Sequence, residues 1–377
     1  MTTFTDTEKV FLELYKAGVW GEIAHKDVLV GKHIDWKAVL GMAEKQAVVG
    51  NVSDGISLLR ETEMPQPLKM KLITYVLTVR KNNETMNAAI PEIYHLLEDI
   101  GIVPVLLKGQ GVAQNYRDPL SRQSGDVDLY IPDTQQIAEA YKLCQQKMKM
   151  IEPLNTDTME AVFQYRNVLV ELHGRINPYV NQTLEQRIPA WCDAIFREEK
   201  ERKVCIGGGF AVLPPLRLDL VFVFVHLTRH YFGGGIGLRQ IADWMRLLYA
   251  HHTDIDQEQL AHDVTYLGIE KIWKVFAAMA VDFLGYPKEK MPLYNERYAD
   301  MGKQVLRYVL DSGNFGYHDV RTKSKSRNYY VRRCKAFTGN MSKILRNFFM
   351  FPHETIYNIP GYLKSGIKRT KFNNKGI

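Results

Sequence analysis

Apolar residues recur every three or four positions through residues 1–90, which is the spacing of one buried face of an α-helix. Thr5 or Asp6 can cap a helix running through TEKVFLELYKAG, and an aspartate can cap a second one in IDWKAVLGMAEKQAV. A third helical stretch, MKLITYVLTVRKNNETMNAAIPEIYHLLEDIG, is expected to break at Pro91, because proline removes a helix hydrogen bond. Residues 1–90 are therefore predicted to form a helical region.

The pattern changes in the next segment. Residues 103–109, VPVLLKG, are a continuous apolar run ending in glycine, which is typical of a central strand buried on both faces. A short helix (GVAQNY), a strand (DVDLYIP), a helix (TQQIAEAYKLCQQKM) and another strand (NVLVELHGRI) follow, and helical spacing returns from position 214. We predict an α+β fold in which a small mixed sheet is flanked by helical regions. The predicted boundaries are 1–90 (helical), 91–213 (α/β core), 214–320 (helical) and 321–377 (tail).

Composition and charge add a distinct tail to this picture. Of the 377 residues, 46% are hydrophobic and 24% charged, as in an ordinary globular protein. Residues 321–377 carry 14 Lys or Arg against one Glu, a net charge of +13, whereas the remainder carries 35 basic and 41 acidic residues, a net −6. The tail mixes these cations with aromatics, so it can bind nucleic acid or an anionic membrane surface, or dock on the acidic body. Within it, MSKILRNFFMF can form a short amphipathic helix.

The four cysteines lie far apart and form no C-x-x-C pair, so neither a disulfide framework nor a cysteine zinc site is indicated. The most apolar segment, LVFVFV, is much shorter than the ~18 residues of a membrane span, and the N-terminus lacks the pattern of an export signal. We therefore expect a cytoplasmic protein.

Two carboxylates share one face of the strand DVDLYIP. Because side chains alternate along a strand, Asp126 and Asp128 point to one side, and Val127, Leu129 and Ile131 point to the core. The two carboxylates lie about 7 Å apart along the backbone, so their repulsion must be offset by a positive group.

The strand VLVELH repeats this arrangement: Val168, Val170 and Leu172 form one face, and Glu171 and His173 lie on the other. If the two strands are neighbours on one core, Glu171 lies beside the aspartates. Three such carboxylates are suited to Mg²⁺, and two ions would clamp a displacement at phosphorus.

The segment LLKGQGVAQNYRDPLSRQSGDVDLYI resembles the nucleotidyltransferase superfamily that includes DNA polymerase beta, in particular a bacterial branch of uncharacterised nucleotidyltransferase-like proteins. IDWKAVLGMAEKQAV and HLTRHYFGGGIGLRQIADW also resemble that branch, which extends the resemblance over most of residues 1–285. The resemblance implies that Gly109 to Gly111 form a phosphate-side turn, that Asp126 and Asp128 are the metal-binding pair, and that Glu171 is the third carboxylate.

The turn departs from the superfamily pattern, in which glycine is followed by serine or glycine. Here Gly109 precedes Gln110 and Gly111 precedes Val112. Lys108 and Arg122 can instead supply positive charge to the phosphates.

The resemblance implies a Mg²⁺-dependent nucleotidyltransferase that moves NMP from an NTP, such as ATP, to an acceptor hydroxyl and releases pyrophosphate. Asp126, Asp128 and Glu171 would be both metal ligands and catalytic residues, and Lys108, Gly109, Gly111 and Arg122 would bind the nucleotide. The acceptor, a small molecule, a protein or an RNA, stays open, as does the oligomeric state. The alternative is an inactive nucleotide-binding or partner-binding module on the same fold. A phosphotransferase is less favoured, because the chain has no H-R-D or D-F-G motif.

Other polar positions favour structural interpretations. His226 and His230 are spaced for a zinc pair but suggest no third ligand, so packing or hydrogen bonding is expected. GGGIG and IGGGF lack the strand and helix context of a phosphate loop and are interpreted as turns. Asp243 is interpreted as a surface helix residue.

Overall fold

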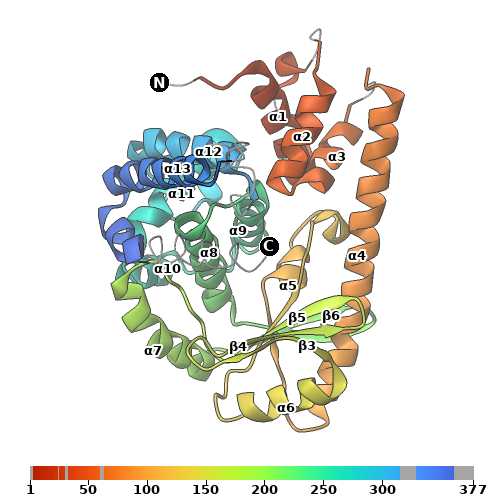
Figure 1. Ribbon diagram of the computed structural model, residues 1–377, viewed down its shortest axis with the longest axis vertical. Helices are drawn as coiled ribbons and strands as arrows, with labels where there is room; N and C mark the ends of the chain where they lie inside the picture. Colours follow the sequence, from red (N-terminus) through yellow and green to blue (C-terminus); the bar gives the residue numbers. More distant parts are fainter. Residues whose placement is uncertain (1–2, 24, 30–32, 60–62, 315–327, 361–377) are drawn as a thin grey trace. The chain divides into compact units, whose positions relative to one another are not determined.

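The computed structural model describes residues 3–23, 25–29, 33–59, 63–314 and 328–360 (Figure 1). These residues form helices, a five-stranded mixed sheet and a two-stranded sheet, so the predicted α+β class is confirmed. The chain divides into two compact units. The first unit comprises Met1–Asn177, Pro189–Val223 and Ile241–Ile255, and the second comprises Pro178–Ile188, Phe224–Gln240 and Asp256–Ile377.

Helices precede the sheet in the first unit: α1 (Asp6–Trp20), α2 (Trp36–Gln46), α3 (Val49–Ser57) and α4 (Gln66–Glu98). Thr5 caps α1 as predicted, because its hydroxyl accepts a hydrogen bond from the Glu8 amide and the Glu8 carboxylate accepts one from the Thr5 amide. Asp35 caps α2 by accepting from the Ala38 amide. Each cap pairs an amide that the first helical turn leaves open.

Glycines bring α1 and α3 into direct backbone contact. A Cβ atom on Gly18 would lie 1.7 Å from the carbonyl oxygen of Asn51, and one on Gly55 would lie 1.9 Å from the carbonyl oxygen of Leu14. Both distances are far below van der Waals contact. A larger residue at either position therefore requires the two helices to separate.

The predicted break at Pro91 is wrong, because α4 continues through it. Pro91 has no N–H to donate to the carbonyl of Asn87, one turn earlier. A hairpin of β6 (Arg202–Ile206) and β7 (Gly209–Leu213) packs at this point, where a Cβ on Gly207 would lie 1.8 Å from the Asn87 oxygen. Tertiary packing thus outweighs the local cost of the proline.

The main sheet has the strand order β1-β2-β5-β4-β3. Its strands are β1 (Val105–Leu107), β2 (Val127–Tyr130), β3 (Lys149–Asn155), β4 (Glu160–Tyr165) and β5 (Val168–His173). β2 and β5 are parallel and the other neighbours are antiparallel. β1, predicted to be central, lies at an edge of this sheet; it is still buried, because α4, α5 (Gly109–Ala113) and β7 pack around it.

The hydrophobic core of the sheet lies under α4 and α6 (Ile137–Lys147), which Figure 1 shows beside the strands. The residues predicted to face the core all lie in it: Val127, Leu129, Ile131, Val168, Val170 and Leu172. The alternation predicted for β2 and β5 is therefore confirmed. Their polar side chains are left on the opposite face of the sheet.

Three helices contain residues of both units: α7 (Gln182–Glu198), α8 (Leu216–Gly233) and α9 (Leu238–Ala250). The second unit adds α10 (Gln257–Tyr266), α11 (Glu270–Leu284), α12 (Ala299–Ser312) and α13 (Tyr329–Met350). Short 3-10 helices lie at Lys26–Val28, Pro119–Ser121, Lys288–Lys290 and Glu296–Tyr298. The core of the second unit is aromatic, with the rings of Phe224 and Trp273 4.6 Å apart and those of Tyr231 and Tyr308 5.2 Å apart.

Within the described ranges, none of the helices combines the length and apolar character needed to cross a bilayer.

The glycine contact between α1 and α3 predicts opposite effects for two Gly→Ala substitutions. G18A should lower the free energy of unfolding by at least about 1–3 kcal/mol, because the methyl group overlaps the Asn51 carbonyl. G41A, on α2, should raise it by about 0.5–1 kcal/mol, because nothing lies within 4 Å of its added Cβ and alanine favours the helix. Urea unfolding followed by circular dichroism measures both, and a G18A variant as stable as G41A would contradict the close contact.

Candidate active site

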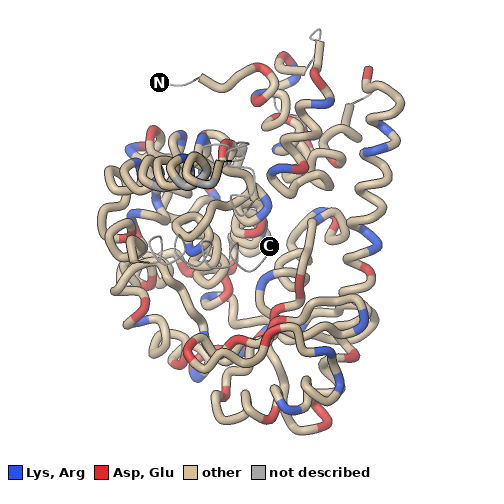
Figure 2. The backbone as a smooth tube through the Cα atoms, viewed as in Figure 1, with Lys and Arg blue, Asp and Glu red and all other residues tan. Residues whose placement is uncertain are grey.

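The candidate site is built on the parallel pair β2 and β5. Asp128 is the register partner of Glu171, and Tyr130 is the register partner of His173. The two predicted strands are therefore neighbours, and their polar faces coincide. Figure 2 shows acidic residues gathered where these strands lie side by side. Among the described residues, Asp128, Glu171 and His173 form a group whose possible ligand atoms all lie within 4.8 Å of one another.

Asp128 is buried at the centre of this group, and two positive groups compensate its charge. The Lys108 Nζ lies 2.7 Å and the His173 Nε2 lies 3.0 Å from the same oxygen, Oδ1. Burial alone raises the pKa of Asp128, but the charge of Lys108 and the hydrogen bond from His173 outweigh it and hold that pKa well below its usual value. Asp128 is therefore a carboxylate at neutral pH, and the positive group expected from the sequence is present.

His173 is surrounded by carboxylates. Its Nε2 lies 3.5 Å from Glu171 Oε2, and its Nδ1 lies 3.7 Å from Glu160 Oε1 on β4. Burial acts to lower the pKa of His173, but hydrogen bonds with Asp128, Glu160 and Glu171 outweigh it and raise the pKa to about 10. Without a cation the ring is an imidazolium that donates to these carboxylates, and a metal ion bound to this group would displace the proton from Nε2, because a ligating imidazole is neutral.

The residues of this group fit a divalent cation. The second oxygen of Asp128, Oδ2, is buried and has no hydrogen-bond partner, so it is an acceptor without a protein donor. Glu171 is about one-third exposed at its side chain, which leaves the group open to a ligand. The sequence predicted oxygen ligands alone, whereas the structure adds the imidazole of His173. Asp126 lies just before β2 and is not a member of this group, although its charge also acts on Lys108.

The turn before α5 contains the predicted nucleotide-binding residues Lys108, Gly109 and Gly111. Lys108 adopts a φ of 40° and Gly109 a φ of 48°. A positive φ is uncommon for a residue with a side chain, and such strain collects at functional sites. A Cβ on Gly111 would lie 2.6 Å from a methyl group of Leu213, so this glycine allows α5 to pack closely on β7.

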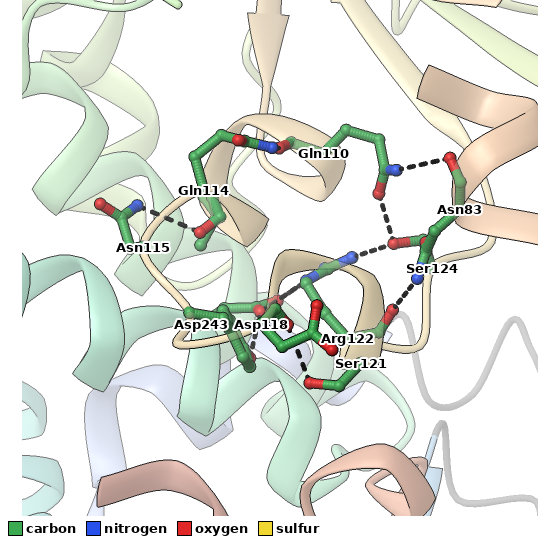
Figure 3. A network of polar contacts seen from close by, with 11 residues as sticks. Asn83, Gln110, Gln114, Asn115, Asp118, Ser121, Arg122, Ser124 and Asp243 are labelled. Atoms are coloured by element: carbon green, nitrogen blue, oxygen red, sulfur yellow. Dashed lines mark hydrogen bonds and ion pairs between the residues drawn. The ribbon is translucent and has the colours of Figure 1, made fainter. Parts of the chain in front are cut away.

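Gln110, the departure from the superfamily turn, directs its side chain into a polar network (Figure 3). Its Nε2 donates to Asn87 Oδ1 at 2.6 Å, and its Oε1 accepts from the Ser124 hydroxyl at 2.6 Å. Asn83, also on α4, donates to the backbone carbonyls of Leu120 and Arg122. This network ties the turn and the loop before β2 to α4.

Arg122 and Asp243 form a buried ion pair (Figure 3). Arg122 donates from Nε and Nη2 to the two oxygens of Asp243, each at 2.7 Å, and from Nη1 to Ser124. The Tyr116 hydroxyl also donates to Asp243. The interpretation of Asp243 as a surface residue is wrong, because it is only 5% exposed. The predicted contact of Arg122 with phosphate stays a prediction, and the structure gives its guanidinium a buried protein partner.

Two other sets of residues bear on ligand binding. The Nε2 atoms of His226 and His230 lie 3.1 Å apart, and the described residues place no third ligand with them. Gly207 and Gly208 form the turn of the β6–β7 hairpin, as the sequence predicted for IGGGF.

An open cleft of about 510 Å³ runs along α4 beside the loop that leads into β2. Hydroxyl and amide groups line it, contributed by Thr74, Thr78, Asn82, Gln123 and Ser124. The Tyr75 hydroxyl donates to Gln123 across the cleft wall, and Lys71, at its edge, is paired with Glu44. Ser124, which lines the cleft, donates a hydrogen bond to Gln110 in the turn before α5, so this bond connects the cleft wall to the turn.

The buried ion pair predicts a large effect for D243N. Losing the charge of Asp243 leaves Arg122 buried without compensation, which should lower the free energy of unfolding by about 3–5 kcal/mol. The same change in the surface pair Asp6–Lys9, where Asp6 is 78% exposed, should cost less than about 1 kcal/mol. Chemical unfolding of D243N and D6N tests this, and equal losses would contradict the structural role of the pair.

Comparison with known proteins identifies the family. No curated protein and no solved structure matches the chain. The family model described as "Uncharacterised nucleotidyltransferase" matches residues 32–285, more than half of the chain, which confirms the resemblance inferred from the sequence. The match includes the turn, β2, β5 and the helices around them. The chain therefore belongs to this nucleotidyltransferase family.

Proposed function

We propose that the protein is a metal-dependent nucleotidyltransferase that moves NMP from an NTP to an acceptor hydroxyl and releases pyrophosphate. The observation that carries this proposal is the pairing of Asp128 with Glu171 on adjacent parallel strands, where the Oδ2 oxygen of Asp128 is buried and has no hydrogen-bond partner. Family membership supports the transferase class.

Asp128, Glu171 and His173 would hold the cation, with Asp126 as the further ligand predicted from the sequence. A bound divalent cation neutralises the charge that develops on the phosphate oxygens. Two Mg²⁺ ions are the predicted cofactor, and the imidazole nitrogen of His173 makes Mn²⁺ a second cation to test.

The protein's own groups account for the rest of the reaction. Lys108 carries a positive charge beside the carboxylates, in a turn suited to approach the triphosphate. Glu171 is exposed enough to accept the proton of the acceptor hydroxyl. The acceptor oxygen then forms a bond to the α-phosphorus, the bond from that phosphorus to the bridging oxygen breaks, and pyrophosphate leaves with the electron pair.

The cleft along α4 is our candidate site for the acceptor. It lies against Gln123 and Ser124, which directly precede Gly125 and Asp126, so one loop connects the wall of the cleft to the acidic strand β2. Apart from Val79 and Lys71, its lining side chains carry neutral hydroxyl or amide groups, and Lys71 is already paired, so an uncharged small molecule with both apolar and hydroxyl groups suits it better than a phosphate. Its volume is within the usual range for small-molecule sites.

The cytoplasmic location also stays part of the proposal. The four cysteines are unpaired, Cys144 and Cys192 buried and Cys205 and Cys334 exposed, which agrees with a reducing compartment.

A matched pair of substitutions tests the role of Glu171. E171Q should reduce NMP transfer by at least about 100-fold, because it removes both a ligand charge and the proton acceptor. E160Q should reduce transfer less, by about tenfold, because Glu160 is outside the candidate metal group and acts only through its contact with His173. The assay is mass spectrometry of a cell extract incubated with each NTP and Mg²⁺ or Mn²⁺, with D128N as the inactive reference.

The same assay separates the two functions that the fold supports. Transfer that is lost in E171Q and D128N but only weakened in E160Q supports the enzyme. Tight binding of Mg²⁺–ATP by the wild-type protein with no NMP gained by any molecule and no pyrophosphate released would favour the nucleotide-binding module instead.

The cleft is tested by filling it. T78W places an indole among the lining groups, so transfer to the acceptor should fall at least tenfold while the Kd for Mg²⁺–ATP is unchanged. L77W is the matched control, because Leu77 is the preceding residue of α4, is 60% exposed and does not line the cleft. Equal transfer by both variants and the wild-type protein would place the acceptor elsewhere.

A further inference from the structure

Helix α13, in the second unit, presents an apolar face to solvent. Seven of its exposed side chains follow a helical stripe: Val331, Cys334, Phe337, Met341, Leu345, Phe348 and Phe349. Phe337 is 60% exposed, Leu345 53% and Phe349 82%. A contiguous stripe of large apolar side chains on a surface marks an interaction site more often than an ordinary surface.

The opposite face of α13 is the polar one, and it packs inward. Lys343 and Asn347 are buried, and Asn347 accepts a hydrogen bond from the Tyr231 hydroxyl in the core of the unit. The Arg346 guanidinium stacks on the ring of Tyr308, with 3.7 Å between its central carbon and the ring centroid. Packing within the unit therefore explains these three polar side chains and leaves the apolar stripe without a role in that core.

The charge of α13 restricts what can cover the stripe. The helix contains five basic residues, Arg332, Arg333, Lys335, Lys343 and Arg346, and no Asp or Glu. Residues 321–377 as a whole carry a net charge of +13. A helix with a Phe- and Leu-rich face and only basic charges has the composition of helices that lie in the interface of an anionic bilayer.

We propose that α13 is a membrane-surface helix that inserts its apolar stripe into the headgroup region of an anionic lipid bilayer. Binding would place the enzyme at a membrane surface without a spanning segment. The proposal stands apart from the transferase activity, because it uses no residue of the candidate active site.

Two other occupants fit the observations less well. A second copy of the chain would bring two helices of like charge together, whereas paired helices normally set opposite charges beside their apolar seam. A nucleic acid requires aromatic rings interleaved with cations on one face. Here Lys343 and Arg346 lie on the inward side, whereas Lys335 is exposed. The exposed face is therefore mainly apolar, which suits a bilayer better than a nucleic acid.

Two exposed cysteines provide a direct test in the full-length protein. Cys334 lies on the stripe of α13, and Cys205 lies on the β6–β7 hairpin of the first unit. An environment-sensitive fluorophore is attached to Cys334 in a C205S background and to Cys205 in a C334S background. Vesicles of phosphatidylcholine with phosphatidylglycerol should shift the emission of the Cys334 label to the blue, more weakly without phosphatidylglycerol or at high salt, and leave the Cys205 label unchanged.

Vesicle flotation of unlabelled protein gives an independent readout. The double variant F337S/F349S should bind phosphatidylglycerol vesicles at least tenfold more weakly than the wild-type protein, with an unchanged Tm because both side chains are exposed. F210S is the matched control, because Phe210 is 66% exposed on β7, and it should bind as the wild-type protein does.

Three outcomes would overturn the proposal. The first is wild-type protein that does not bind the anionic vesicles. The second is binding that F337S/F349S retains in full. The third is a stripe occupied by something else: a dimer seen by light scattering, or an RNA complex, that the double variant loses while vesicle binding is absent.

Discussion

The parallel pairing of β2 with β5 is the constraint on which the candidate site depends. This register sets Asp128 opposite Glu171 and Tyr130 opposite His173. A shift of one residue would turn Asp128 into the core and bring Leu129 to the polar face. The buried residues Val127, Leu129, Val170 and Leu172 oppose that shift, so the same hydrophobic core that stabilises the sheet also fixes the geometry of the carboxylates.

Charge compensation makes this geometry possible. A buried carboxylate is costly unless it is paired and hydrogen-bonded, and Asp128 is held by both Lys108 and His173. Lys108 reaches it from a turn whose positive φ values give the chain a sharp change of direction after β1. The site residues therefore come from three segments that only the folded sheet brings together.

The sequence predicted best those features that depend on residues close together in the chain, such as strand alternation and helix caps. The alternation along β2 and β5, the caps at Thr5 and Asp35, and the membership of the family were all readable. The hairpin of β3 and β4 was not predicted, because β3 is almost wholly exposed and lacks an apolar alternation.

Contacts between residues far apart in the sequence explain where the other sequence-based predictions differ from the structure. Pro91 stays helical because a hairpin more than 100 residues later packs on it, with a Cβ on Gly209 only 2.7 Å from the proline ring. Asp243 is buried because Arg122 lies against it across 121 positions of sequence. His173 entered the metal group through its register on β5, and its place on the same face as Glu171 was the only sequence signal for it.

Gln110 shows how a departure from a family pattern can be structural. A serine or glycine after the first glycine of the turn leaves the backbone open to phosphate, and a glutamine there suggests a blocked turn. In this fold the Gln110 amide instead donates to Asn87 on α4, and its oxygen accepts from Ser124 in the loop before β2. Because α4 also forms one wall of the cleft, a single long helix supports the turn, the loop before β2 and the space we assign to the acceptor. The larger residue thus fixes the turn to α4, and its own polar groups are already paired within the protein.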